Sequence, residues 1–389
     1  MRAVAIGCGA FAAWVASATL ASAQPFATPP LPAPPRPFAI SAPAEATLSN
    51  GLRVIVARRD SVPLVSATLL VLSGAEADPP RLAGLASMTA GLLTQGTRAR
   101  SAPQVAAAAE ALGGSLDSGA GWHQSAVSIT VTTPRLDAAL GLVAEVAMRP
   151  TFAPQELDRL RTQSLDAMKL SYASPGALAD LVVARLVFGD GPYGRPTGGT
   201  PQSLPRIARA DLLALHARAY RPDNAVLILA GDITAEAGAA LARKHFGAWR
   251  KRVGAAATSR VAALGAAAEG AEAAIVDMAQ SGQAAVVVAL PLPPLTGREP
   301  AIAGVLNAVL GGGYSSRLSQ EIRIERGLSY GASSGIEPRR GGALLRVTVQ
   351  TKNASAAEVV RLVDAELDRL AAAPVDTAEL EARKATLIG

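Results

Sequence analysis

Short apolar runs alternate with longer amphipathic stretches along most of this 389-residue chain. Residues 52–57 and 64–72 are rich in Val, Leu and Ile and flank a charged turn, so both are predicted to be strands. Apolar residues at helical spacing predict a helix over 82–94. The pattern further predicts helices at 103–112, 136–148, 154–172, 210–219 and 235–246, strands at 125–133 and 225–230, and a Gly/Pro-rich loop at 189–205.

A second unit follows a Gly/Ala-rich stretch at 251–272, whose weak periodicity predicts a linker. In this unit, residues 300–310 are predicted to form an amphipathic helix. One face of that helix carries Ile302, Val305, Leu306 and Val309. The other elements predicted after the linker are strands at 273–276, 284–290 and 343–350 and helices at 356–370 and from 377 onward.

The two units carry an internal repeat. Glu156, near the start of a predicted helix, matches Glu379, and Leu165 matches Ile388. The first unit continues to about residue 249, whereas the second stops at 389. We therefore expect either a truncated chain or an abbreviated second domain. An amphipathic helix that stops in mid-pattern favours truncation.

Residues 1–23 have the features of a secretion signal. Arg2 gives a basic start, an apolar stretch follows, and Ala-Ser-Ala at 21–23 forms a cleavage site before Gln24. A membrane anchor is the alternative, but the stretch is Ala-rich and ends in small residues. A Pro-rich tether over 24–45 is predicted next. We expect a periplasmic or secreted protein.

Composition narrows the possible partners. Cys8, the only cysteine, lies inside the signal, so the mature protein can form neither a disulfide nor a Cys-liganded zinc site. The net charge is +6 and the pI is near 9.8. Nucleic acid is not expected as a partner, because the Arg residues are scattered and aromatic residues make up 4%. No run after the signal is long and apolar enough to span a bilayer.

Residues 84–97 read GLASMTAGLLTQGT. This stretch resembles the zinc-binding helix of the pitrilysin/insulinase/mitochondrial-processing-peptidase family, which reads roughly G-[LI]-A-H-x-x-E-H-x-[LM]-x-x-G-[TS]. The frame is kept, but the two His positions and the Glu position hold Ser87, Gly91 and Ala90. Such side chains can neither bind zinc tightly nor take a proton from its water.

The resemblance also locates the family's third zinc ligand, a Glu on a later helix in a pattern like E-R-x-x-x-x-x-E. Aligning Arg161 with the Arg of that pattern puts Ala167 at the ligand position and Leu160 at the first Glu. All three ligands and the base are therefore replaced, and no metal is expected in this chain.

Other residues offer no evident substitute site. Asp158 and Asp166 lie eight positions apart on one predicted helix and are interpreted as a solvated face. The histidines are far apart and lack a His at i+3 or i+4, so surface or structural roles are expected for His123, His216 and His245.

One functional pair of the family is matched. Its catalytic assemblies use an Arg and a Tyr seven residues apart, and Arg323 and Tyr330 have this spacing within EIRIERGLSY. The resemblance implies that the Tyr donates to an oxyanion and the Arg holds a substrate carbonyl or carboxylate. A surface Arg and a packed Tyr are the structural alternative. The glycines at 311–313 suit either close approach to a peptide or a helix C-cap.

In this family the peptide substrate adds as a strand to an exposed sheet edge. The matching stretch here is GSLDSGAG at 114–121. An ordinary flexible edge, with glycines that limit aggregation, is the alternative. The candidate contact residues are Gly114, Ser115, Leu116, Asp117 and Ser118.

The resemblance implies an α+β fold with two homologous domains, at 46–250 and 273–389, that form a clamshell. Each would hold an antiparallel-dominated sheet with helices on one face. The implied function is the non-catalytic subunit of a periplasmic heterodimeric zinc peptidase, with Arg323 and Tyr330 acting at the partner's site. No cofactor is expected in this chain, and a homologous H-x-x-E-H subunit would hold the zinc. An inert peptide-binding or scaffolding protein, and an active metallopeptidase with unusual ligands, are the alternatives.

Overall fold

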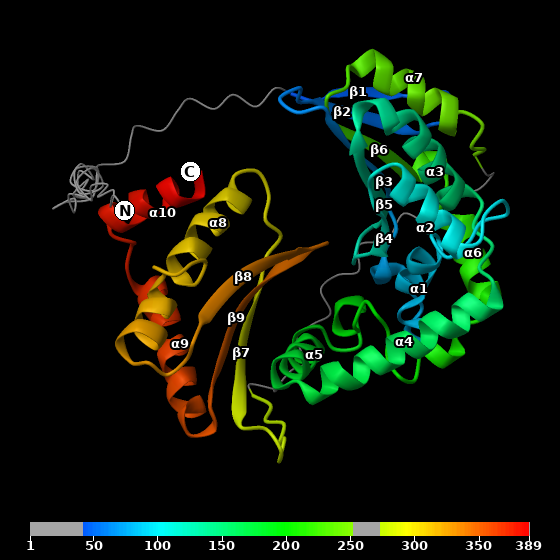
Figure 1. Ribbon diagram of the computed structural model, residues 1–389. Helices are drawn as coiled ribbons and strands as arrows, with labels where there is room; N and C mark the ends of the chain where they lie inside the picture. Colours follow the sequence, from blue (N-terminus) through cyan, green and yellow to red (C-terminus); the bar gives the residue numbers. More distant parts are fainter. Residues whose placement is uncertain (1–41, 252–272, 389) are drawn as a thin grey trace, which may run out of the picture. The chain divides into compact units, whose positions relative to one another are not determined.

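The computed structural model describes residues 42–251 and 273–388, which form two β-sheets with helices packed against them (Figure 1). The predicted signal at 1–23, nearly all of the predicted tether and nearly all of the predicted linker lie outside the described residues. All the described residues belong to one compact unit. The α+β class, with two sheet-plus-helix domains, is confirmed.

The first sheet has six strands in the order β1-β2-β6-β3-β5-β4. Its one parallel pair is β2 with β6, and the other pairs are antiparallel. The strands are β1 Ala44–Thr47, β2 Arg53–Arg58, β3 Leu64–Val71, β4 Leu116–Ala120, β5 Ser125–Thr132 and β6 Ala225–Gly231.

The first two predicted strands, β2 and β3, do not pair with each other, because β6 lies between them. The sequence of β6, AVLILAG, is apolar on both faces, as expected for a strand in the middle of a covered sheet. Both strands are confirmed, but the charged turn between them does not join neighbouring strands of the sheet.

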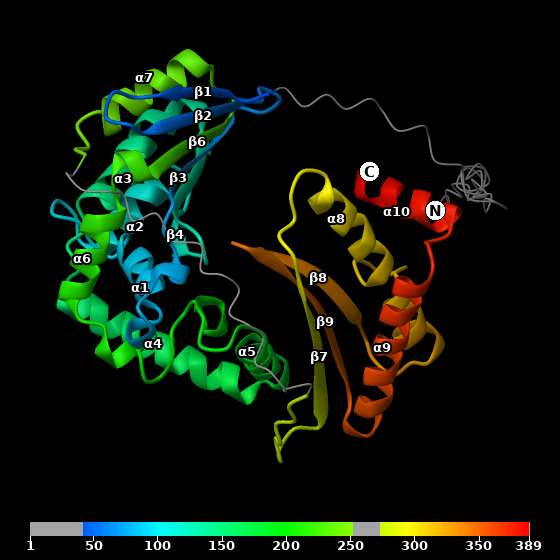
Figure 2. The ribbon, with the colours of Figure 1, turned by 180° about the vertical axis from the view of Figure 1, so that it is seen from behind.

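Seven α-helices lie within residues 42–251, and one of them, α5, packs against β7 (Gln283–Leu292) of the second sheet (Figure 2). The predicted helix at 82–94 is shorter than expected, because Pro80–Leu82 form a 3-10 turn and Gly84 has a left-handed φ of 94°. A helix directly after α4 was not predicted. The helices are α1 Leu85–Leu92, α2 Ala102–Ala111, α3 Leu136–Met148, α4 Pro154–Ala173, α5 Pro175–Phe188, α6 Arg209–Ala219 and α7 Ala235–Phe246.

The second sheet has three antiparallel strands in the order β7-β9-β8. The predicted strand at 273–276 is wrong, since that segment has no regular structure and Ile275 is almost fully exposed. The elements are β7 Gln283–Leu292, β8 Ala332–Arg339, β9 Gly342–Lys352, α8 Glu299–Leu310, α9 Ala356–Ala372, α10 Thr377–Ile388 and the π-helix η7 Ser319–Glu325.

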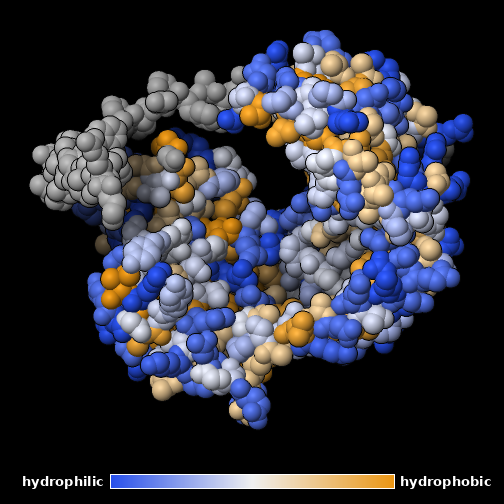
Figure 3. All heavy atoms as spheres, in the orientation of Figure 1, coloured by the Kyte–Doolittle hydropathy of each residue, from blue (hydrophilic) through white to orange (hydrophobic). Residues whose placement is uncertain are grey.

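The predicted apolar face of α8 is only partly buried. Val309 is fully buried, but Ile302 is 64% exposed and Leu306 is 40% exposed. The helix instead buries Ala303 and Leu310. Apolar side chains on the view in Figure 3 lie as scattered patches among hydrophilic ones.

The internal repeat is visible in the structure. The series β5, α3, α4 in the first domain corresponds to β9, α9, α10 in the second. Each sheet has its own apolar core, and a smaller cluster of Phe188, Tyr193 and Leu344 packs residues of both domains together. Within the described residues, no single helix is long and apolar enough to cross a membrane. Helices α4 and α5 are long and apolar enough only when taken together, and the chain bends by 96° between them.

Candidate functional site

Helix α1, which carries the altered zinc motif, is anchored at its start by a buried carboxylate. Asp78 Oδ2 accepts hydrogen bonds from the backbone N–H of Gly84 at 3.0 Å and of Ala86 at 3.2 Å. Burial raises the pKa of Asp78 to about 7, and the hydrogen bonds from these amides and the nearby Arg195 oppose the rise. A Cβ at Gly84 would lie 2.9 Å from the Gly198 carbonyl oxygen, so this start also requires glycine.

The motif positions on α1 make structural contacts. Ser87 Oγ donates to the Thr197 carbonyl at 2.7 Å, and Ala90 is fully buried. The Ala90 carbonyl accepts a hydrogen bond from Ser118 Oγ of β4 at 2.8 Å. A Cβ at Gly91 would lie 3.2 Å from Leu160 Cδ2. The residues that fill the motif therefore hold α1 against its neighbours.

Helix α4, which carries the third ligand position, packs against α1. Leu160 and Ser164 face α1, the latter with its Oγ 4.0 Å from Met88 Sδ. Ala167 comes at i+7 from Leu160, on the same side of the helix, and is exposed. The structure thus brings the helices of the four replaced zinc positions (Ser87, Ala90, Gly91 and Ala167) together, as a zinc site would require.

The side chains at these positions do not fit zinc. Zinc in proteins is bound by thiolate, imidazole or carboxylate groups, and none of the replaced positions supplies one. Among residues 42–251 and 273–388, no three His, Cys, Asp or Glu side chains gather as possible ligands. His216 Nε2 lies 2.8 Å from the Ala147 carbonyl, and His245 Nε2 lies 2.7 Å from Asp137 Oδ1.

The predicted substrate strand is β4, at one edge of the first sheet. Among the described strands it pairs with β5 alone. It lies beside α1 in both ribbon views, and the Ser118–Ala90 hydrogen bond fixes that position (Figures 1 and 2). A Cβ at Gly119 would meet nothing within 4 Å, so the strand leaves room for a close backbone approach. Gly114 and Ser115 precede the strand.

A cavity of about 490 Å³ opens beside the start of β4. Its apolar part comes from Leu116 and from Val105 and Ala109 of α2. Its polar part comes from Glu110 and from Arg159 of α4. The cavity could receive a side chain of a peptide that lies along β4.

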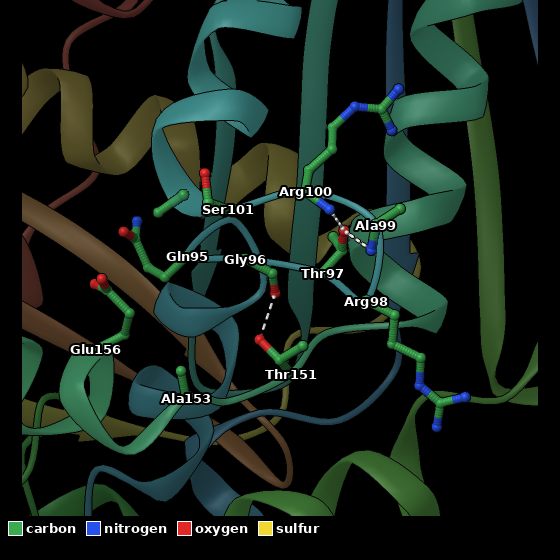
Figure 4. Close-up of a pocket in the computed structure, with 11 residues that line it drawn as sticks. Gln95, Gly96, Thr97, Arg98, Ala99, Arg100, Ser101, Thr151, Ala153 and Glu156 are labelled. Carbon is green, nitrogen blue, oxygen red and sulfur yellow. Dashed lines mark hydrogen bonds between the residues drawn. The ribbon is translucent and has the colours of Figure 1, made fainter.

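A smaller hollow of about 330 Å³ surrounds the loop over residues 95–101 (Figure 4). Thr97 Oγ1 accepts from the backbone N–H of Ala99 and Arg100 and lies 2.6 Å from Glu145 Oε1. Figure 4 shows the side chain of Arg98 pointing away from the hollow. The hydroxyl of Thr97 therefore stabilises the loop, and we assign the hollow no chemistry.

The predicted Arg/Tyr pair is in contact. The guanidinium carbon of Arg323, on the π-helix η7, lies 4.8 Å from the ring centre of Tyr330. Tyr330 is 90% exposed, so it is not a packed core residue. The same guanidinium also lies 4.8 Å from the ring centre of Tyr314. Sequence reasoning missed Tyr314, although it directly follows the singled-out glycines at 311–313.

A polar cluster joins the β8–β9 hairpin to the first domain. Glu76 accepts from Arg340 Nε at 2.6 Å, and Tyr193 Oη accepts from the Arg340 backbone N–H at 3.0 Å. His123 Nε2 lies 2.9 Å from Tyr193 Oη, and burial lowers the pKa of His123. Arg340 follows β8, whereas Tyr330 precedes it, so this cluster does not bring Tyr330 to α1.

Known proteins resemble the chain over both sheets. Residues 53–200 match the family model described as Insulinase (Peptidase family M16), and residues 206–387 match the one described as Peptidase M16 inactive domain. A Mycobacterium tuberculosis protein named as an uncharacterized zinc protease is 30% identical over 361 residues, which cover 92% of this chain and 82% of that protein.

Two solved structures are similar as well. A peptidase M16 inactive domain from Pseudomonas fluorescens has a TM-score of 0.79 and 26% identity, over 90% of this chain and 84% of that chain. A protease from Helicobacter pylori has a TM-score of 0.81 and 20% identity, over 89% of this chain and 84% of that chain. The second likeness concerns the fold alone.

Proposed function

Because the chain belongs to peptidase family M16, we propose that it is the zinc-less subunit of a heterodimeric zinc peptidase of the periplasm. One observation carries the proposal: α1 packs against both α4 and β4, while all four replaced zinc positions lack a zinc ligand or base. The predicted signal at 1–23 supports export.

In this proposal the partner is a homologue with an intact H-x-x-E-H motif. Its zinc, when bound, polarises the scissile carbonyl and activates a water molecule. Tyr330 donates its phenol proton in a hydrogen bond to the oxyanion that forms on the peptide. Arg323 provides a fixed cation for the substrate backbone or a carboxylate. The exposure of Tyr330 supports this role, since its hydroxyl is free to meet a partner's substrate.

The test is a reconstituted pair of this chain with such a homologue. Tyr330→Phe removes one donor and is expected to lower kcat on the order of 100-fold. Arg323→Ala is expected to raise KM as well, because a fixed charge is lost. Arg361→Ala, an exposed cation on α9, is the control for loss of charge. Size exclusion checks assembly; if both variants assemble and cleave at the wild-type rate, the proposal is wrong.

A second candidate is an inert peptide-binding or scaffolding protein. The open edge of β4 favours it, because a strand can pair with that edge without any zinc. This candidate predicts peptide binding by the chain alone and no hydrolysis with any H-x-x-E-H homologue. A gene for such a homologue next to this one would favour the heterodimer instead.

A further inference from the structure

Among the described residues the two sheets have four edge strands, and three of these carry features that discourage pairing with another chain. Strand β1 has only four residues, all of them exposed. Strand β4 carries the exposed Asp117, and β8 carries Glu337, Pro338 and Arg339. Short strands, charges and prolines are common protections of sheet edges. The fourth edge strand, β7, lacks these protections along most of its length.

Strand β7 reads QAAVVVALPL and has ten residues without a charge. Among the described strands it pairs with β9 alone. Its one proline, Pro291, is the second-last residue, so residues 283–290 all keep a backbone N–H. A long, apolar and uncharged edge is a template for pairing with a further strand.

The two faces of β7 are covered, so the open part of this strand is its edge. Val286 and Val288 pack against the core of the second domain. Ala289 points to the opposite face and packs against the cluster that includes Phe188 of α5. Residues 284–289 are nevertheless only half-buried, as expected for a strand whose backbone is open on one side.

Helix α5, which packs against β7, is apolar nearly all round (Figures 1 and 2). A helix of this kind is normally buried, yet only two residues of α5 are buried. Both charged residues of α5 already have partners within the chain. Asp180 is paired with Arg346 at 3.0 Å. Arg185 is paired with Asp190, so α5 and β7 together present an apolar surface whose charges are already neutralised.

The internal repeat indicates which kind of strand fits the edge of β7. The order β7-β9-β8 corresponds to β3-β5-β4 in the first sheet, so β7 takes the place of β3. The other edge of β3 is occupied by β6, an apolar and uncharged strand that runs antiparallel to it. The segment AVVVAL of β7 resembles AVLILA of β6. A second β7 in antiparallel orientation therefore resembles the strand that fills this place in the first sheet.

We propose that β7 of this chain pairs antiparallel with β7 of a second copy and that the two chains form a symmetric dimer. The joined sheet has the order β8-β9-β7-β7-β9-β8 and six strands, as many as the first sheet. A two-fold axis keeps each face of the sheet on its own side, so residues opposite each other belong to the same face. Val287 or Val288, in the middle of the strand, then lies opposite its own counterpart.

The contact closes on itself, because it uses the one unprotected edge of each copy. The joined sheet ends on both sides in β8, whose Glu337, Pro338 and Arg339 oppose further pairing. The partner is therefore one second copy and not a growing chain of copies. This proposal does not rest on the proposed function.

Sedimentation velocity of the chain from Gln24, over a concentration series, measures the association. The wild type is expected to change from monomer to dimer and to stop there. Leu290→Lys is expected to raise the dissociation constant of the dimer on the order of tenfold or more, because a charge on an edge strand opposes pairing. Leu213→Lys on α6 is the matched control, since Leu290 is 40% exposed and Leu213 is 39% exposed. Tyr330→Phe, which lies outside β7, should dimerise like the wild type.

Distances between spin labels test the geometry with Leu290 intact. The chain from Gln24 contains no cysteine, so Gln283→Cys carries one label per copy. Gln283 is exposed at the start of β7. In an antiparallel pair centred on Val287 or Val288, the two copies of residue 283 lie about eight to ten residues apart along the sheet, or about 27–34 Å at about 3.4 Å per residue. A parallel pair would bring their backbones within about 5 Å of each other.

A chain that stays monomeric at every concentration would overturn the proposal and leave the edge of β7 to a strand of another protein. Equal effects of Leu290→Lys and Leu213→Lys, growth beyond the dimer, or the label distance of a parallel pair would overturn it as well. Circular dichroism checks the fold of each variant, and the label distance decides if Leu290→Lys does not fold. No H-x-x-E-H homologue is used, so this proposal and the proposed function fail separately.

Discussion

Replacing Asp78 by Asn removes the one buried carboxylate that anchors the start of α1. Asp78 is 5% exposed and accepts backbone hydrogen bonds from Gly84 and Ala86. Its pKa is raised from 3.8 to about 7, chiefly by burial. An Asn side chain offers one acceptor in place of two, so we expect Asp78→Asn to be less stable than wild type by about 1–2 kcal/mol at low pH.

The pH dependence gives the sharper test. Well below pH 3.8 the Asp78 carboxyl is protonated in both states, and well above pH 7 it is charged in both. Between these values the folded state alone holds the proton, so the free energy of unfolding falls as pH rises. At about 1.4 kcal/mol per pH unit, the wild type should lose about 2–3 kcal/mol between about pH 5 and pH 8 from this group. Asn does not titrate and should lose none of it.

Urea unfolding followed by tryptophan fluorescence measures this difference, since Trp122 and Trp249 both lie in the domain that holds Asp78. The quantity to compare at pH 5 and pH 8 is the difference in the free energy of unfolding between wild type and Asp78→Asn. The other titrating groups contribute equally to both proteins and therefore cancel from this difference. Asp166→Asn, an exposed carboxylate on α4, is the control. A stability difference that stays constant from pH 5 to pH 8 would refute the reasoning.

Two further predictions concern the stability of the second domain and zinc binding at the four replaced zinc positions. Glu366→Gln removes a buried charge that accepts a hydrogen bond from Arg317 at 3.1 Å, so hydrogen exchange should show α9 and α10 destabilised by about 1–3 kcal/mol. The exposed Glu381→Gln is the control and should have little effect. Equal effects of the two substitutions would contradict this prediction. The variant with Ser87→His, Ala90→Glu, Gly91→His and Ala167→Glu should not retain one equivalent of zinc after dialysis, because a Cβ at position 91 would lie 3.2 Å from Leu160 Cδ2. Adding Leu160→Ala should raise the zinc content. Full zinc occupancy without Leu160→Ala would refute this explanation.

Elements with clear local signals were predicted well. Helix α7 begins after Thr234, whose Oγ1 accepts from the Ala237 backbone N–H, so its start follows from local capping chemistry. Helix α5 was missed because its LVVARLVF run is apolar nearly all round and gives no single stripe. Strand β8 was missed because its sequence, ASSGIEPR, lacks the apolar run of a typical strand.

The candidate site likewise has features that were predicted from the sequence and features that were missed. Once the resemblance to the family had located the ligand positions, side-chain identity at Ser87, Gly91 and Ala167 was enough to recognise that the zinc ligands are replaced. The spacing of Arg323 and Tyr330 was also evident, but their contact with Tyr314 was not. That contact depends on how closely Gly311 approaches β8, which involves residues more than 20 positions apart in the chain.

The sequence by itself determined most of the helices and strands, the internal repeat, and the residues that stand at the family's zinc positions. The elements follow from local periodicity, the zinc positions were located by the resemblance to the family, and the lack of ligands there follows from the chemistry of single side chains. Tertiary structure alone decided that β6 separates β2 from β3, that Ile302 and Leu306 remain exposed, and that two tyrosines hold one arginine. Such features depend on contacts between residues far apart in the chain, and local periodicity carries no information about which distant segments will meet.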